Sequence, residues 1–328
     1  MAVWLVTGAT GFVGRHVLDV LTSSGQFSAG SDEHVIALGR RRPSGWPEAR
    51  FIEADLNDVA ALRLALRGTD PDFVIHTAGR TPPASDDELY RANFWSTTHL
   101  LSVLRSLERP IRVVLSGSAA ELGPVEPAKL PVGEDYASDP VDAYGRSKHM
   151  ATLRGLSEPP PLEVTVARVF NPIGPGIPPT LAFGRFAARL GEPGPDPLEL
   201  PVGDLDARRD FIDVRDVARA MIALALRGQA GQVYHVGTGR SQRVGDGLEI
   251  LVRISGRSVK MRVDPELQGR RGSLDSRAAI GRIVAQTGWE PRISWEQSLD
   301  DLWREARDRR SPDFWSPAPR PCELLLAS

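Results

Sequence analysis

Short apolar runs alternate with amphipathic stretches along the first half of the chain. Runs rich in Val, Ile and Leu predict buried strands, and apolar residues recurring at helical spacing between them predict helices. The predicted strands are Val3–Val6, His34–Leu38, Phe51–Ile52, Phe73–His76, Val113–Ser116 and Val164–Val169. The predicted helices are Val13–Leu21, Val59–Leu66, Asp87–Arg105 and Tyr144–Leu156. This alternation is typical of βαβ units, so we expect an α/β fold built on a doubly wound parallel sheet.

The pattern changes in the second half of the chain. Residues 171–203 are dense in Pro and Gly, which indicates a departure from the sheet. Beyond them we predict helices at Val214–Leu226, Asp246–Ile254 and Ser294–Arg307 and a strand at Gln232–Val236. We expect residues 1–170, with a returning segment near 204–238, to form the sheet domain. Residues 171–203 and 239–316 are expected to form a smaller C-terminal domain, and 317–328 a loose tail.

The composition is that of an ordinary globular protein. Of the 328 residues, 41% are hydrophobic and 25% are charged, which suits one large domain or two moderate ones. The formal net charge is −2 and the pI is about 6.3. This balance argues against nucleic acid or an anionic membrane surface as a partner.

Cysteine usage and the first residues bear on the compartment. The single cysteine, Cys322, rules out an internal disulfide framework and a thiolate metal cluster, so no metal is expected. The apolar start of the chain lacks a cationic segment, and Gly8 soon interrupts it, which is not typical of a signal peptide. No apolar run is long enough to cross a bilayer. We therefore expect a cytoplasmic protein.

A glycine-rich turn follows the first predicted strand. Gly8, Gly11 and Gly14 are spaced G-x-x-G-x-x-G. Missing side chains let the backbone approach a pyrophosphate, and the following helix points free N–H groups at that charge. A plain strand-to-helix turn is the alternative, but its place at the start of a βαβ series favours a dinucleotide site. The expected ligands in this turn are Gly8, Thr10, Gly11, Phe12, Val13 and Gly14.

The residues after the second and third strands bear on which dinucleotide binds. NAD sites usually carry an acidic residue after the second strand, whereas this chain has Arg40 and Arg41 in a run of three arginines. Guanidinium groups suit a 2′-phosphate, so NADP is favoured, with NAD possible. The alternative is a solvated Arg run. Asp55 and Leu56, after the third strand, are placed to receive the adenine amino group.

Tyr144 and Lys148 are the candidate acid–base pair. Four residues apart, they share one face of a helix. A nearby ammonium stabilises a phenolate and lowers its pKa, so the hydroxyl can exchange protons with an alcohol or carbonyl. Most pairs at this spacing are surface pairs. The chain has only three lysines, however, so a Lys148 that serves only as a surface charge is less expected.

Ser118 is the third candidate catalytic residue. It follows a predicted strand, so its hydroxyl should emerge at the carboxyl edge of the sheet, where ligands bind in open α/β folds. From there it could hold a substrate oxygen for Tyr144. Ser116 is the competing candidate.

In this order, the glycine turn, the strand-end serine and the Tyr-x-x-x-Lys pair resemble the extended short-chain dehydrogenase/reductase family, also called the NAD-dependent epimerase/dehydratase family. The resemblance implies a Rossmann-type sheet domain and a smaller C-terminal substrate-binding domain. It also implies that Lys148 holds the nicotinamide ribose. Further residues that it places in the cofactor site are Thr77, Ala78, Gly79 and Asn93.

Two later segments resemble those that hold nucleotide-sugars in this family. The first starts Arg168-Val-Phe-Asn171-Pro and the second Arg209-Asp-Phe-Ile-Asp. The resemblance makes Asn171 and Arg209 ligands of the substrate diphosphate, and an Arg fork does suit phosphate oxygens. The alternative for Arg209 is a salt bridge with a nearby Asp. Arg270 is a weaker candidate for a second phosphate ligand.

The residues after Ser118 separate the reactions that this scaffold hosts. Dehydratases of the family resemble Thr-Asp-Glu at the serine position, whereas this chain has Ser118-Ala119-Ala120, which argues against dehydration. Ser118-Ala-Ala-Glu121-Leu-Gly instead resembles GDP-6-deoxy-4-keto-hexose reductases, although Leu122 replaces their Tyr.

We therefore predict an NADP(H)-dependent reductase of a nucleotide-linked 4-keto-6-deoxy sugar, with Tyr144 as proton donor to the C4 oxygen. The alternatives are a nucleotide-sugar 4-epimerase with tightly bound NAD and a non-catalytic NADP-binding regulator. The resemblance also implies a homodimer through Asp87–Arg105 and Tyr144–Leu156.

Overall fold

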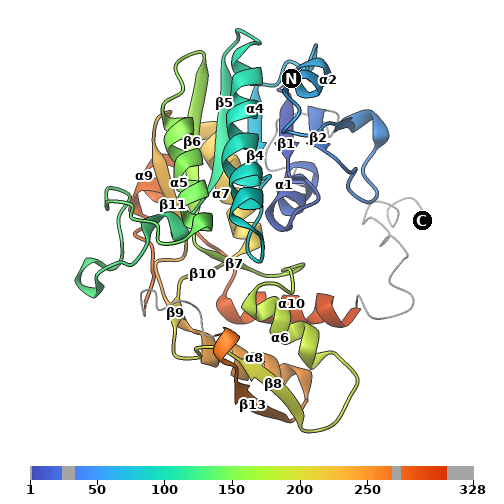
Figure 1. The fold of residues 1–328 in the computed structure, drawn as a ribbon, viewed down its shortest axis with the longest axis vertical. Coiled ribbons are helices and arrows are strands. Elements are labelled where there is room, and N and C mark those ends of the chain that lie inside the picture. The colour runs from blue at the N-terminus through green and yellow to red at the C-terminus, as the bar shows by residue number, and fades with distance from the viewer. Residues whose placement is uncertain (1, 24–33, 268–274, 309–328) are drawn as a thin grey trace, which may run out of the picture.

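Seven parallel strands form one sheet in the computed structural model, which describes residues 2–23, 34–267 and 275–308 (Figure 1). The strand order is β11-β6-β5-β4-β1-β2-β3. The strands are β1 (Trp4–Thr7), β2 (Val35–Gly39), β3 (Phe51–Glu53), β4 (Phe73–His76), β5 (Ile111–Ser118), β6 (Leu162–Val169) and β11 (Val233–Val236). The chain moves outward from β1 to β3 and then returns to the other side of β1 at β4. This reversal is the topological switch point at which open α/β sheets bind ligands.

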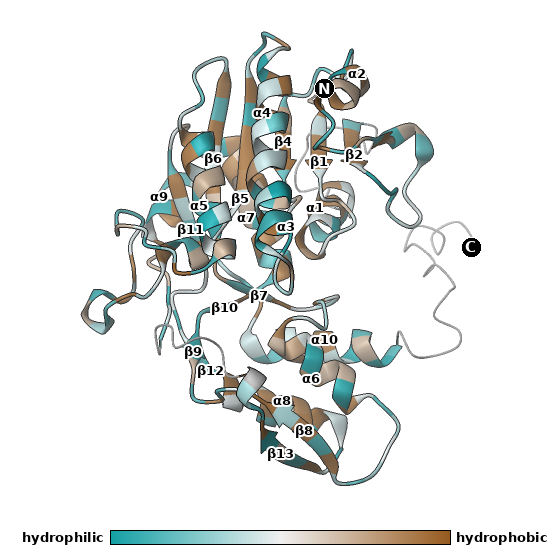
Figure 2. Cartoon of the chain, viewed as in Figure 1, coloured by the Kyte–Doolittle hydropathy of each residue, from teal (hydrophilic) through white to brown (hydrophobic). Residues whose placement is uncertain are grey.

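Helices cover both faces of the sheet, which explains why its strands read as apolar runs. One face packs against α1 (Phe12–Ser23), α7 (Val214–Arg227) and α9 (Gly281–Thr287). The other packs against α2 (Val59–Ala65), α4 (Ser96–Arg105) and α5 (Ala143–Leu156). Figure 2 shows the strands largely brown between helices that carry hydrophilic residues. The predicted doubly wound α/β fold is confirmed.

The helix predicted over Asp87–Arg105 has three parts. It begins as α3 (Asp86–Tyr90), continues as a π-helical turn, η3 (Arg91–Trp95), and ends as α4. Ser85 and Glu88 form a reciprocal capping box at its start. The apolar spacing predicted one continuous helix, and the π-helical turn within it was not predicted.

A second group of elements lies beyond the carboxyl edge of the sheet, in the lower part of Figure 1. It comprises α6 (Ala182–Leu190), β8 (Leu198–Val202), α8 (Val244–Ser255), β13 (Val259–Val263) and α10 (Trp295–Asp308), which share a hydrophobic cluster of their own. The short pairs β7 (Asn171–Ile173) with β10 (Phe211–Asp213), and β9 (Arg208–Arg209) with β12 (Gln242–Arg243), lie where the chain passes between the groups. Short helical turns are η2 (Glu48–Arg50), η4 (Ala119–Leu122), η5 (Pro127–Lys129) and η6 (Pro265–Leu267).

Two regions depart from the sequence prediction. The Pro- and Gly-rich residues 171–203 contain α6, which was not predicted. Its flanks, Pro178-Pro179 and Gly191, dominate the local composition, although Phe183, Phe186, Ala187 and Leu190 form a buried helical stripe. The helix α9 was also not predicted, and it packs against the sheet. The expected tail, 317–328, lies outside the described residues.

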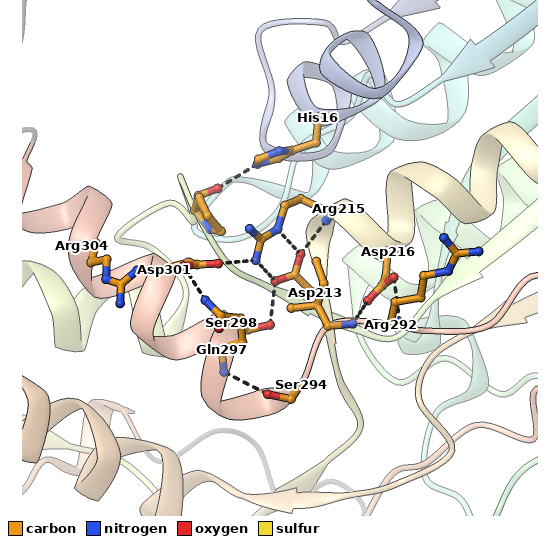
Figure 3. A network of polar contacts seen from close by, with 12 residues as sticks. His16, Asp213, Arg215, Asp216, Arg292, Ser294, Gln297, Ser298, Asp301 and Arg304 are labelled. Atoms are coloured by element: carbon orange, nitrogen blue, oxygen red, sulfur yellow. Dashed lines mark hydrogen bonds and ion pairs between the residues drawn. The ribbon is translucent and has the colours of Figure 1, made fainter. Parts of the chain in front are cut away.

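A polar network joins α7 to α10, and Figure 3 shows it from close by. The Asp213 carboxylate caps α7 and accepts hydrogen bonds from Arg215 Nε and Nη2, each at 2.8 Å, and from Ser298 Oγ at 2.6 Å. Arg215 also lies 2.7 Å from Asp301 on α10. Burial alone would raise the pKa of Asp213, but the bonds from Arg215 and Ser298 outweigh it and hold that pKa below its ordinary value.

None of the helices in residues 2–23, 34–267 and 275–308 has the length and apolar character needed to span a membrane.

Replacing Asp213 by Ala should lower the free energy of unfolding by about 3 kcal/mol at neutral pH, because it removes one of the two counter-ions of the partly buried Arg215 guanidinium, the N-cap of α7 and the acceptor for Ser298. The matched change Ser298→Ala removes one hydrogen bond and should cost about 1 kcal/mol. Urea denaturation measures both. Because the folded-state pKa of Asp213 is depressed, its contribution should fade as the pH falls below the ordinary aspartate value of 3.8. Equal losses in the two variants would contradict this account.

Candidate active site

The glycine turn after β1 packs directly on the segment that follows β4. Gly8 has φ of 71°, and a Cβ there would lie 2.5 Å from the Ala78 backbone nitrogen. A Cβ on Gly14 would lie 2.7 Å from Thr77 Oγ1, and this hydroxyl donates a hydrogen bond to Thr7 O at 2.7 Å. The structure thus brings the predicted turn residues together with Thr77 and Ala78. The free N–H groups at the start of α1 complete a cradle that fits a dinucleotide pyrophosphate.

Arg40 and Arg41 lie exposed directly after β2, the strand next to β1. They stand at the same carboxyl edge as the glycine turn, in a position that suits a 2′-phosphate. Asp55 is already engaged in its own loop, since its Oδ1 accepts hydrogen bonds from Asn57 N at 2.9 Å and Asn57 Nδ2 at 3.3 Å. The neighbouring Leu56 is buried. Their contact with adenine stays a prediction.

Asn93, in the π-helical turn, ties the segment after β4 to α5. Its Oδ1 accepts a hydrogen bond from Arg80 N at 2.8 Å, and its Nδ2 donates to Arg80 O and to Ser147 Oγ, each at 3.0 Å. Gly79 leaves room for this contact, because a Cβ there would lie 2.7 Å from Asn93 Oδ1 and 3.8 Å from Lys148 Nζ. The amide therefore orients the helix that carries Lys148, whereas direct contact with a cofactor stays a prediction.

Tyr144 and Lys148 occupy the first turns of α5, whose start is capped by the Asp142 carboxylate. Lys148 is 8% exposed, and burial lowers its pKa to about 8 against the opposing charge of Glu121. Burial raises the pKa of Tyr144, while a hydrogen bond with the Ser118 side chain lowers it. Overall the pKa of Tyr144 is raised above its ordinary value, so the phenol is protonated at neutral pH and can donate a proton.

Ser118, and not Ser116, is the serine whose side chain acts on the pKa of Tyr144, and its role as the third catalytic residue stays a prediction. Ser118 ends β5 at the carboxyl edge, and its Oγ accepts a hydrogen bond from Ala120 N at 3.2 Å. The geometry can thus hold a carbonyl oxygen between a serine hydroxyl and a protonated phenol. That arrangement suits proton transfer to the oxygen of a ketone under reduction.

Two buried features beside this triad were not assigned from the sequence. His76 lies between Thr7 Oγ1, 2.7 Å from Nδ1, and Thr97 Oγ1, 3.0 Å from Nε2. Burial and the charge of Lys148 lower the pKa of His76 to about 3, so it is neutral. The other feature is an ion pair of Glu121 with Arg168. The sequence signal for Glu121 is its capping-box spacing from Ser118, three residues earlier.

Of the predicted substrate residues, Asn171 is hydrogen-bonded to Asp210, and Arg209 directly precedes Asp210 in the chain. Asn171 donates to Asp210 O from both its backbone nitrogen and its Nδ2 at 3.1 Å. The side chain of Asp210 accepts hydrogen bonds from Thr238 Oγ1 at 2.6 Å and from the backbone nitrogens of residues 238, 239 and 278. Arg209, next in the chain, is half-buried; burial lowers its pKa, and the carboxylates of Asp204 and Asp275 act against that shift. Arg270 lies outside the described residues.

Comparison with known proteins agrees with this geometry. The family model "NAD dependent epimerase/dehydratase family" matches residues 4–237. GDP-6-deoxy-D-mannose reductase of Pseudomonas aeruginosa is 31% identical over 307 residues, covering 90% of this chain and 93% of that protein. UDP-glucose 4-epimerase of Neisseria gonorrhoeae is 30% identical over 334 residues, covering 92% of this chain and 96% of that protein.

Solved structures show the same likeness. The structure of RMD from Pseudomonas aeruginosa complexed with NADPH superposes with a TM-score of 0.78 at 29% identity, covering 94% of this chain and 100% of that one. The chain therefore belongs to the NAD-dependent epimerase/dehydratase family and is an NAD(P)-dependent enzyme of the extended short-chain dehydrogenase/reductase type.

Proposed function

We propose that this enzyme is an NADP(H)-dependent reductase of a nucleotide-linked 4-keto-6-deoxy sugar. The observation that carries the proposal is that the end of β5, with Ser118, and the start of α5, with Tyr144 and Lys148, lie beside a turn that offers no catalytic carboxylate at Ala119 or Ala120. Such a site can protonate a carbonyl oxygen but lacks the extra acid and base that eliminating water requires. The 31% identity to a GDP-6-deoxy-D-mannose reductase supports the same reaction.

Three side chains divide the work on the substrate. When bound, the dinucleotide supplies the hydride. Tyr144 donates its proton to the C4 oxygen, and Ser118 orients that oxygen by hydrogen bonding. The Lys148 ammonium, whose Nζ lies beside Gly79 at the carboxyl edge, holds the nicotinamide ribose and favours proton release from Tyr144. Tyr144 regains its proton from water.

The substrate diphosphate is assigned to Asn171 and Arg209, with Arg270 as a further ligand. Asn171 and Arg209 flank the same clamped residue, Asp210, so their separation is held by buried hydrogen bonds. A guanidinium carried on a backbone fixed in this way loses less conformational freedom when it binds phosphate oxygens. We also propose that residues 1–170 with 204–238 bind the dinucleotide, while 171–203 with 239–316 bind the nucleotide-sugar.

A 4-epimerase is the second candidate, because UDP-glucose 4-epimerase of Neisseria gonorrhoeae is 30% identical. It would use the same triad and return the hydride to the opposite face of the sugar. It would also keep NAD through purification, so releasing and identifying the bound dinucleotide separates the two candidates. A non-catalytic NADP-binding regulator is disfavoured, because Ser118, Tyr144 and Lys148 are all present.

A panel of nucleotide-linked 4-keto-6-deoxy sugars with NADPH or NADH tests the function by loss of cofactor absorbance and by product configuration. We expect at least one member to be reduced with NADPH. Tyr144→Phe should then lower kcat by about 10³-fold, because the proton donor is gone. NADPH affinity, measured by calorimetry, should stay within a factor of a few. No oxidation with any member, or near-normal turnover by the Phe variant, would overturn the assignment.

The double variant Arg40→Ala/Arg41→Ala tests the cofactor preference. Both side chains are exposed, so the fold should be unaffected. The Kd for NADPH should rise by about 10- to 100-fold through loss of charge-assisted hydrogen bonds, while that for NADH stays unchanged. Arg63→Ala, on α2, is the control. An equal loss for both dinucleotides would argue against recognition of the 2′-phosphate.

We also propose that the enzyme is a homodimer through the face formed by α4, α5 and the π-helical turn. These helices lie side by side on the sheet and expose Trp95 (49%), Met150 (38%) and Leu153 (54%). Met150→Glu/Leu153→Glu should convert a dimer to a monomer in sedimentation velocity, because charges would be buried at the interface. Val263→Glu, an exposed change on β13, should leave the assembly unchanged. A wild-type monomer would refute the proposal.

A further inference from the structure

A buried ion pair lies directly behind the catalytic serine. Glu121, in the turn η4, accepts hydrogen bonds through Oε2 from Arg168 Nη2 at 3.1 Å and Arg168 Nε at 3.3 Å. The Glu121 side chain is fully buried, and that of Arg168, on β6, is 4% exposed. Buried ion pairs of this kind seldom add stability relative to apolar residues. The presence of this buried pair therefore needs an explanation other than stability, and the other contacts of Glu121 and Arg168 supply one.

The second carboxylate oxygen of Glu121 holds the backbone of Ser118. Glu121 Oε1 accepts a hydrogen bond from Ser118 N at 2.7 Å, within the capping box that also directs Ala120 N to Ser118 Oγ. The approach requires a glycine at 117, since a Cβ there would lie 2.7 Å from Oε1. One carboxylate thus connects the catalytic serine at the end of β5 to Arg168 on the neighbouring strand.

Arg168 is held in turn by β11, the next strand of the sheet. Its Nη1 lies 3.4 Å from His235 Nε2, and its Nη2 donates to Ser138 Oγ at 3.3 Å. His235 Nδ1 lies 3.1 Å from Val132 O. Burial and the charge of Arg168 lower the pKa of His235 to about 3, so this histidine is a neutral acceptor for the guanidinium. The hydrogen bonds therefore run from Ser118 through Glu121 and Arg168 to His235.

Glu121 also acts on both members of the acid–base pair. Its charge raises the pKa of Tyr144 and opposes the lowering of the Lys148 pKa by burial. Of the other groups that face the pair, Asp142 also raises the Tyr144 pKa, and His76, near Lys148, is neutral. Glu121 is therefore the carboxylate that Tyr144 and Lys148 share.

We propose that Glu121 is a positioning residue, with Arg168 as its counter-ion: its buried carboxylate fixes Ser118 at the end of β5, beside Tyr144 and Lys148. The proposal rests on the reductase function. It assigns the buried pair a role in the site rather than in folding. Removing the charge should consequently move the pH profile, which a merely structural role would not do.

Glu121→Gln is the direct test, because the amide keeps an oxygen for Ser118 N and loses the charge. Tyr144 and Lys148 should then deprotonate at lower pH, and the alkaline limb of the kcat profile should move down by about one pH unit. Arg168→Lys, which keeps the charge, should retain the wild-type limb. Glu158→Gln is the matched control, since Glu158 is a fully buried carboxylate paired with Arg154 at the other end of α5. Glu158→Gln should leave the alkaline limb of the kcat profile at its wild-type pH.

A substrate-free measurement separates this proposal from the reductase function. Phenolate absorbance, taken as the difference from Tyr144→Phe variants, reports the Tyr144 pKa directly and should fall in Glu121→Gln even if no sugar is reduced. If that variant does not fold, Glu121→Leu/Arg168→Met removes both charges together and should fold. It should show a downward shift that is smaller, because the Arg168 charge is lost as well, and a kcat about 100-fold lower, because Ser118 loses its anchor. An unmoved Tyr144 pKa and an unmoved alkaline limb in the folded variants would overturn the proposal.

Discussion

The close packing of the turn after β1 on the segment after β4 is the constraint on which the site depends. Gly8 and Ala78 approach to a distance that admits no side chain at position 8. That approach brings the start of α1, the Thr77 hydroxyl and the following Gly79 to one edge of the sheet. Gly79 in turn leaves room for Asn93, and Asn93 reaches Ser147 on the catalytic helix. Backbone contacts thus orient Tyr144 and Lys148 relative to the dinucleotide cradle.

The same edge combines charges that would be costly to bury alone. Lys148 is buried beside a neutral histidine, His76, and shares the field of Glu121 with Tyr144. Glu121 is itself neutralised by Arg168. Because the charge of Glu121 acts on Lys148 and is itself paired with Arg168, the site can keep an ammonium and a protonated phenol together in a poorly solvated place. That combination favours donating a proton over accepting one at neutral pH.

The sequence predicted the sheet well because buried parallel strands are apolar runs, and β4 has the predicted bounds. The glycine turn was also predicted, because its spacing is local, and it does lie between β1 and α1. The sequence could not reveal the Glu121–Arg168 pair, since those residues meet only through the β5–β6 register, in which Gly117 lies opposite Arg168. The helix α6 was missed for a different reason. The buried apolar stripe of α6 is regular. Pro and Gly on both sides of it dominate the local composition, however, and that composition does not predict a helix.

Three aspartates spaced three residues apart explain how Asn171 and Arg209 can be held with little regular structure around them. Asp210 binds the segments at 238–239 and 278, Asp213 binds Ser298, and Asp216 accepts hydrogen bonds from the backbone nitrogens of residues 292 and 293. Each carboxylate is buried and engaged by the protein. The segment from Arg209 to Asp216 therefore acts mainly as a clamp on the C-terminal elements. Because this clamp fixes the backbone next to Arg209 and also holds Asn171, the relative position of these two residues does not depend on a bound ligand.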